Sequence, residues 1–86
     1  MYVVITYDVD AKRCNKIMKL LRQYLFHVQK SVFEGELNPN KLEELKEKIS
    51  NIIIEDDSIR IYYTYNNKQL YKSSLGQPIK NFNIII

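Results

Sequence analysis

The order of strand-like and helix-like segments constrains the fold of this chain more than any other feature. Residues 2–7 read Tyr-Val-Val-Ile-Thr-Tyr, a β-branched and aromatic run that suits a central strand covered on at least one face. Residues 11–25 place apolar side chains at helical spacing, and so does a second segment that begins at Pro39. Residues 26–37, between the helices, and residues 59–65 favour strand. The pattern β-α-β-β-α-β predicts an α/β (α+β) fold.

Capping residues and turns define the ends of these segments. Asp10 is expected to cap the first helix, and Asn38 the second. A tight bend near Lys30 would divide residues 26–37 into two short strands, and Gly35 suggests a bulge or a close approach of the backbone. Two split β-α-β units of this kind form an antiparallel sheet with both helices on one face. The other face then needs a cover, and a second copy of the chain is the simplest one.

The length of the chain limits it to one compact domain. With 86 residues, the domain 1–86 would have a thin core that a partner chain would help to stabilise. Residues 66–81 are polar and are expected to form a loop with a short strand around residues 70–71. Residues 82–86 are apolar and are expected to form an additional C-terminal strand that associates with a dimer.

Composition narrows the classes of protein and the compartment. The formal net charge of +3 is mildly basic and compatible with a nucleic-acid partner. The single cysteine, Cys14, excludes an internal disulfide and fits a reducing compartment. The start does not resemble a signal peptide, and no apolar run approaches the ~18–20 residues of a membrane span. We therefore expect a cytoplasmic protein without a membrane partner. Cys14 lies on the apolar helical face and is expected to belong to the core.

Asp8 is the carboxylate most suited to chemistry, because it directly follows the predicted central strand and precedes a helix. Mg²⁺ needs only one or two protein carboxylates together with water and phosphate. Asp8 is therefore a candidate ligand for Mg²⁺ or Mn²⁺. The alternative is that Asp8 only starts a turn, as Asp often does.

The first helix carries cations and, after its cap, no acid. Such a row could line a phosphate backbone, which makes these side chains candidates for binding nucleic acid. The alternative is an ordinary solvated face. The five cations are Lys12, Arg13, Lys16, Lys19 and Arg22.

His27 is the only histidine of the chain. A lone His makes a zinc centre unlikely. It is a candidate general base or phosphate contact, or else a half-exposed strand residue. The sequence holds no Gly-rich phosphate loop, no nucleophile elbow and no paired Cys motif. Composition and spacing by themselves therefore indicate only a basic α/β domain.

Four stretches, taken together, resemble the CRISPR-associated protein 2 family, the small subunit of the spacer-acquisition machinery. Residues 2–9 form the first strand closed by an aspartate, and residues 12–17 match the basic first-helix pattern. Residues 28–35 read Val-Gln-Lys-Ser-Val-Phe-Glu-Gly, which resembles the family core Val-Gln-x-Ser-Val-Phe-Glu-Gly and is the most specific match. Residues 57–62 resemble the late-strand pattern Asp-x-Ile-Arg-x-Tyr. These matches cover residues 2–65 in the right order and spacing.

The resemblance implies a ferredoxin-like fold and a tight homodimer, in which the Asp8 residues of both chains hold a divalent metal across the two-fold axis. It implies metal-dependent nuclease activity on RNA or DNA in some members. Ser31 and Phe33 are further candidates for the catalytic site, which they would shape near Asp8. The resemblance also implies a scaffold role, in which two copies of a CRISPR integrase dimer clamp the dimer and a prespacer duplex lies along it.

Two positions depart from the family pattern. Cys14 stands where a second Arg is frequent, and His27 where an Arg often precedes Val-Gln. Both departures remove a permanent cation, which weighs against strong nuclease activity more than against the scaffold role. Two interpretations stay open, a metal-dependent endonuclease and a non-catalytic dimeric adaptor that positions a prespacer for an integrase. A third, a small-molecule-sensing domain from outside the family, is disfavoured by the basic first helix and the lack of a ligand loop.

Overall fold

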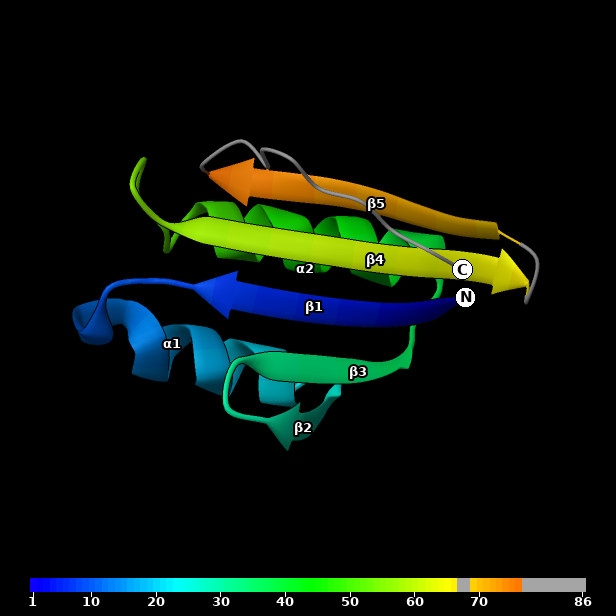
Figure 1. Ribbon diagram of the computed structural model, residues 1–86, viewed down its shortest axis with the longest axis horizontal. Helices are drawn as coiled ribbons and strands as arrows, with labels where there is room; N and C mark the ends of the chain where they lie inside the picture. Colours follow the sequence, from blue (N-terminus) through cyan, green and yellow to red (C-terminus); the bar gives the residue numbers. More distant parts are fainter. Residues whose placement is uncertain (67–68, 77–86) are drawn as a thin grey trace.

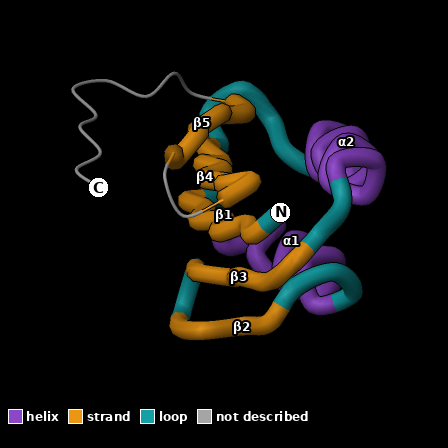
Figure 2. Tube along the Cα trace, turned by 90° about the vertical axis from the view of Figure 1, so that its right-hand side faces the viewer, coloured by secondary structure: helices purple, strands orange, loops and turns teal. Residues whose placement is uncertain are grey.

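The protein is described here by a computed structural model that covers residues 1–66 and 69–76. Two helices lie on one face of a five-stranded sheet (Figure 1), and the view along the strands shows that the opposite face carries no helix (Figure 2). The strand order is β2-β3-β1-β4-β5 and every pair is antiparallel. The arrangement is ferredoxin-like, as predicted, with one strand added at the edge. The elements are β1 (Tyr2–Asp8), α1 (Ala11–Arg22), β2 (Phe26–Gln29), β3 (Val32–Glu36), α2 (Pro39–Ser50), β4 (Ser58–Asn66) and β5 (Gln69–Gly76).

β1 is the central strand, because it pairs with β3 on one side and with β4 on the other. Its side chains alternate between the two faces of the sheet. Val3 and Ile5 are fully buried under the helices, whereas Val4 and Thr6 point to the face without helices, which we call the open face. The core between sheet and helices is made of Val3, Ile5, Tyr7, Ile17, Leu20, Leu21, Leu25, Phe33, Leu42, Leu45, Ile49, Ile59 and Ile61.

The caps of both helices are confirmed. The Asp10 side chain accepts a hydrogen bond from the Lys12 amide at 3.0 Å, and the Asn38 side chain accepts one from the Lys41 amide at 2.8 Å. The first helix ends at Arg22, three residues earlier than predicted, because the chain turns there so that β2 can begin at Phe26.

The hairpin predicted within residues 26–37 is confirmed as β2 and β3, with the bend at residues 30–31. Its bulge lies between His27 and Gln29. Gly35 instead pairs regularly with Val3, and a Cβ there would lie 3.2 Å from the Cδ2 atom of Leu25. Gly35 therefore lies close to the Leu25 side chain, and the predicted bulge does not occur at this glycine.

The short strand predicted around residues 70–71, within the polar stretch 66–81, is confirmed and is longer than expected, because Gln69–Gly76 form β5 along the edge of β4. Side chains at the edge of a sheet stay partly in water, so polar composition did not reveal the full length of this strand. Its inward contacts hold it in place, since Leu75 packs against the core and the Tyr71 ring stacks on Tyr63 at 5.4 Å. The strand predicted for residues 82–86 lies outside the described residues. No helix of the described part is long and apolar enough to cross a membrane.

Candidate functional site

Asp8 ends β1 with its side chain exposed, at the point where the central strand leaves the sheet. Strand pairing places Asp8 beside Ser58 and Thr6 beside Arg60, and cross-strand partners share a face. Alternation along β1 puts all four on the open face. Together with Tyr7 they line a hollow of 160 Å³. Asp8 thus shares this hollow with two hydroxyl-bearing residues of the open face, Thr6 and Ser58, and with Arg60.

A second hollow, of 270 Å³, lies on the other side of Asp8 and reaches the start of α1. Four carboxylates line it, from Asp8, Asp10, Asp56 and Asp57, against the single guanidinium group of Arg13. Negative charge therefore predominates around Asp8, which favours the approach of a cation and opposes that of a bare phosphate.

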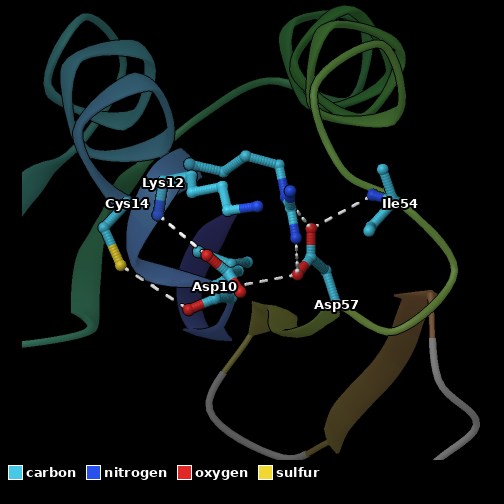
Figure 3. Close-up of polar contacts among 7 residues, drawn as sticks. Asp10, Lys12, Cys14, Ile54 and Asp57 are labelled. Atoms are coloured by element: carbon cyan, nitrogen blue, oxygen red, sulfur yellow. Dashed lines mark hydrogen bonds and ion pairs between the residues drawn. The ribbon is translucent and has the colours of Figure 1, made fainter.

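Asp57 is the buried centre of this region, with 2% of its surface exposed. Its Oδ2 atom accepts hydrogen bonds from Arg13 Nε at 2.5 Å and from the Ile54 amide at 3.0 Å. Its Oδ1 atom accepts from Arg13 Nη2 at 3.0 Å and from the Asp10 amide at 3.1 Å. Figure 3 shows these contacts, which tie the α2–β4 loop to the turn between β1 and α1. A buried carboxylate needs such donors, and Asp57 has four of them.

The same contacts shift the ionisation of both partners. The hydrogen bonds from Arg13, followed by those from the Ile54 and Asp10 amides, lower the pKa of Asp57 from 3.8 to about 2, against the opposing effect of desolvation. The hydrogen bond to Asp57 raises the pKa of Arg13 above its ordinary value. The pair is therefore fully ionised at neutral pH.

A divalent metal at Asp8 fits the donors of this region in a restricted way. Within the described residues, no group of three or more His, Cys, Asp or Glu side chains is arranged to hold a metal ion. One chain thus offers the Asp8 carboxylate, with water and phosphate left to fill the other positions. Mg²⁺ and Mn²⁺ bind at sites where the protein supplies only one or two carboxylates and water or phosphate supplies the other oxygen ligands. Zn²⁺ instead prefers three or four His and Cys ligands. A magnesium site completed by a second chain is compatible with this geometry.

The lysines predicted to bind nucleic acid are brought together. Lys12, Lys16 and Lys19 are exposed on α1, and their spacing of four and three residues puts them in one row, which we call the lysine row. Arg13 is different, because its side chain is only 17% exposed and is bonded to Asp57. Arg13 therefore lies apart from the lysine row, next to Asp57.

The candidates from the β2–β3 hairpin are not gathered around Asp8. Phe33 is fully buried in the core under the helices, so its side chain packs the interior and has no access to a substrate. His27 is exposed on β2, with its ring stacked on Phe33 at 4.5 Å and its Nε2 atom 2.8 Å from the Lys30 carbonyl oxygen. Ser31 contacts the strand that carries Asp8 through its backbone, since its carbonyl oxygen accepts a hydrogen bond from the Tyr7 amide at 3.1 Å.

Sequence reasoning missed the residues that approach the site from β4. Arg60 lines the open-face hollow with Asp8, and Asp57 holds the turn that follows Asp8. Both belong to the stretch 57–62, whose pattern marks the family and indicates no role for either residue. The role of Asp57 could not be predicted because Asp57 and Arg13 are 44 residues apart, and a single sequence does not show which distant charges form a pair.

The fold and the site define a ferredoxin-like domain whose central strand ends on an exposed carboxylate beside an open sheet face. Residues 1–72 match the protein family described as CRISPR associated protein Cas2. The chain is 48% identical over 77 residues to the CRISPR-associated endoribonuclease Cas2 of Thermotoga maritima, which covers 88% of each chain. The chain therefore belongs to the Cas2 family.

Solved structures agree with this assignment. A crystal structure of a Cas2 protein superposes with a TM-score of 0.75 and 41% identity, covering 100% of this chain and 98% of the other. The crystal structure of Streptococcus pyogenes Cas2 at pH 6.5 superposes with a TM-score of 0.70 and 38% identity, covering 78% of this chain and 89% of the other. Both likenesses cover most of the chain.

Proposed function

We propose that this chain is a CRISPR adaptation protein that works as a homodimeric, metal-dependent endonuclease on RNA or DNA phosphodiesters, with Asp8 as its metal-holding residue. The observation that carries the proposal is the position of Asp8, exposed at the end of the central strand and on a sheet face that no helix covers within residues 1–66 and 69–76. The endoribonuclease name of the relatives supports the same chemistry.

The open face of the sheet supports the proposed homodimer. Tyr2 and Val4 lie on this face, and Tyr2 is 42% exposed although it belongs to the central strand. A small domain gains stability by covering such a surface. A second copy that packs on it through a two-fold axis would bring a second Asp8 toward the first. Each chain would then supply one carboxylate to the same ion.

The metal would activate a water molecule and neutralise charge on the scissile phosphate when bound. Asp8 would hold it, and the negative hollow around Asp8 favours its entry. A cation between two facing Asp8 carboxylates would offset their mutual repulsion. The lysine row on α1 would hold the nucleic-acid backbone.

A non-catalytic adaptor is the second candidate function, and the sparse equipment around Asp8 favours it. His27, the only histidine, stacks on Phe33 on the opposite face of the sheet from Asp8 and does not reach it as a general base. In this alternative the dimer scaffolds a CRISPR integrase and a prespacer duplex without cutting either. The same lysine row would then bind duplex DNA.

Metal binding tests the role of Asp8. Isothermal titration with Mn²⁺ should detect a site in the wild type that is lost in Asp8→Asn, which keeps the shape of the side chain and removes its charge. Glu43→Gln is the matched control, because it removes an exposed carboxylate on α2, a helix on the opposite side of the sheet from the open face that carries Asp8. Equal Mn²⁺ binding by wild type and Asp8→Asn would remove the basis of the proposal.

Spacer acquisition in cells separates the two candidate functions. If Asp8 holds a required metal, Asp8→Ala abolishes acquisition while the protein still binds its integrase. If the chain is an adaptor, Asp8→Ala supports acquisition at the wild-type level. Glu43→Gln again reports the effect of removing an unrelated charge.

A further inference from the structure

We infer that Arg13 and Asp57 are positioning residues for Asp8, and that Arg13 acts through this ion pair and not as a contact to nucleic acid. The inference rests on the proposed role of Asp8 and concerns how this carboxylate is held. It reassigns Arg13, whose place on a basic helix would otherwise put it among the phosphate-binding side chains.

The geometry of Arg13 argues against a second partner of the size of a phosphate. Its Nε and Nη2 atoms both donate to Asp57, at 2.5 Å and 3.0 Å, so the fork that would grip a phosphate is already used. The side chain is 17% exposed, whereas Lys12, Lys16 and Lys19 are exposed on the same helix. Arg13 would have to leave a buried, charged carboxylate to bind a phosphate, which is unfavourable.

Asp57 passes the constraint on to the segment that carries Asp8. Its Oδ1 atom accepts from the Asp10 amide, two residues after Asp8. The next residue after Asp57, Ser58, is the strand partner of Asp8. The backbone that follows Asp8 is therefore tied to one buried side chain, which directly precedes the strand partner of Asp8, and Arg13 is bonded to that side chain.

The hydrogen bonds within the turn after Asp8 do not by themselves fix the position of this turn on the sheet. The Asp10 side chain accepts from the Lys12 amide and the Asp10 carbonyl from the Arg13 amide, which fastens the turn to α1. Neither bond fixes α1 relative to the end of the sheet from which Asp8 projects. The Arg13–Asp57 pair supplies that relation, because it joins α1 to the loop that enters β4 (Figure 3).

The test compares cleavage kinetics and salt dependence of binding in Arg13→Ala, Asp57→Asn and the double variant. Small displacements of a catalytic group lower kcat, so each single variant should lose about 10- to 100-fold in kcat. The double variant should lose no more than the worse single one, because both changes break one unit. The slope of log affinity against log salt should be unchanged in all three, whereas Lys16→Ala should reduce its magnitude by about 0.9.

The conservative variant Arg13→Lys tests whether this position needs the two parallel donors of a guanidinium group or only a positive charge. A lysine can still meet a phosphate but does not reproduce the two parallel bonds to Asp57, so kcat should stay low. Restoration of wild-type kcat and slope by Arg13→Lys, together with a slope reduced in Arg13→Ala, would overturn the inference. Ile49→Val, a core change on α2, is the control for lost stability and should keep wild-type kcat.

Amide hydrogen exchange keeps the test independent of nuclease activity. In Arg13→Ala, exchange should accelerate at the Asp10 and Ile54 amides, which donate to Asp57, and should stay slow at the core amide of Ile5. If Asp8→Asn cleaves as well as wild type, the proposed function fails and this measurement alone decides the inference. Unchanged exchange at Asp10 would refute the positioning role whatever the activity.

Discussion

Among single residues, Asp57 carries the clearest link between ionisation and stability. It is buried, and its carboxylate is held charged by Arg13 and two backbone amides. Removing the charge of one partner in such a pair leaves the other without compensation. The free energy of unfolding should therefore depend on this one carboxylate more than on the exposed acids of α2.

The first prediction concerns the pH dependence of stability. Because the folded pKa of Asp57 is lowered to about 2 from 3.8, its contribution is complete above pH 3.8 and is lost as the pH falls toward 2. At pH 7, Asp57→Asn should lower the free energy of unfolding by about 3 kcal/mol. Urea titrations at pH 7 and pH 2 should show that this difference shrinks in acid. A difference that is the same at both pH values would contradict the assignment.

At the scale of elements, Gly76 connects the edge strand β5 to this centre. Gly76 has a φ of +83°, and a Cβ there would collide with the Asp57 carbonyl oxygen. By contrast, a Cβ at Gly35 would meet the end of the Leu25 side chain at 3.2 Å, and a side chain can move aside. The two glycines of the chain thus have different reasons to be glycine.

Alanine substitutions should separate these reasons. Gly76→Ala combines backbone strain with a collision against backbone, so it should lower the free energy of unfolding by about 2 kcal/mol or more. Gly35→Ala should cost less, about 1 kcal/mol. Chemical denaturation of both variants measures the difference. A Gly76→Ala protein as stable as Gly35→Ala would show that the end of β5 is not fixed against Asp57.

The lysine row of α1 carries a prediction on nucleic-acid affinity. Lys12, Lys16 and Lys19 are exposed in one row, so replacing all three by Ala should weaken binding alike across sequences. Each phosphate that the variant no longer neutralises should reduce the magnitude of the salt slope on duplex DNA by about 0.9. Fluorescence anisotropy at several salt concentrations measures the slope. As a matched control, Lys46→Ala removes a lysine on α2, and an equal effect of both changes would place the binding surface elsewhere.

Sequence patterns predicted the elements that depend on neighbouring residues. They missed features that depend on contacts between residues far apart in the chain. The caps at Asp10 and Asn38 and the hairpin of β2 and β3 depend on neighbouring residues, so they could be predicted from the sequence. The full length of strand β5 depends on the edge of β4, so its polar residues predicted only a short strand around residues 70–71. At the candidate site, Asp8 and the lysines were proposed from their position and spacing. The engagement of Arg13 depends on Asp57, 44 residues away, and only the folded chain brings them together.

For the whole molecule, the sheet face that no helix of the described residues covers defines the expected assembly. Val4 lies on this open face at the middle of the central strand, between Glu34 of β3 and Tyr62 of β4. A homodimer through the open face would bury Val4. Tyr65, in contrast, clusters with Tyr63 and Tyr71, and Tyr63 packs against the helix-covered core. The two positions thus report on opposite faces.

Placing the same charged side chain on each face tests the dimer. Val4→Lys should give a monomer, because burying an unpaired ammonium group in the interface is unfavourable. Tyr65→Lys should remain a dimer, because its 61% exposed side chain lies on the other face. Sedimentation velocity distinguishes the two states. A stable Val4→Lys dimer would show that the chains do not associate through the open face.

The central claim is that Asp8, exposed at the end of the central strand, makes this Cas2-family chain a metal-dependent nuclease. The most direct test is cleavage of labelled RNA and duplex DNA by wild type and Asp8→Asn, purified in parallel, across a titration of Mg²⁺ or Mn²⁺. We predict that wild-type cleavage increases with metal concentration and that Asp8→Asn does not cleave at any concentration. Equal cleavage by both proteins would contradict the claim, because a contaminating nuclease gives that result.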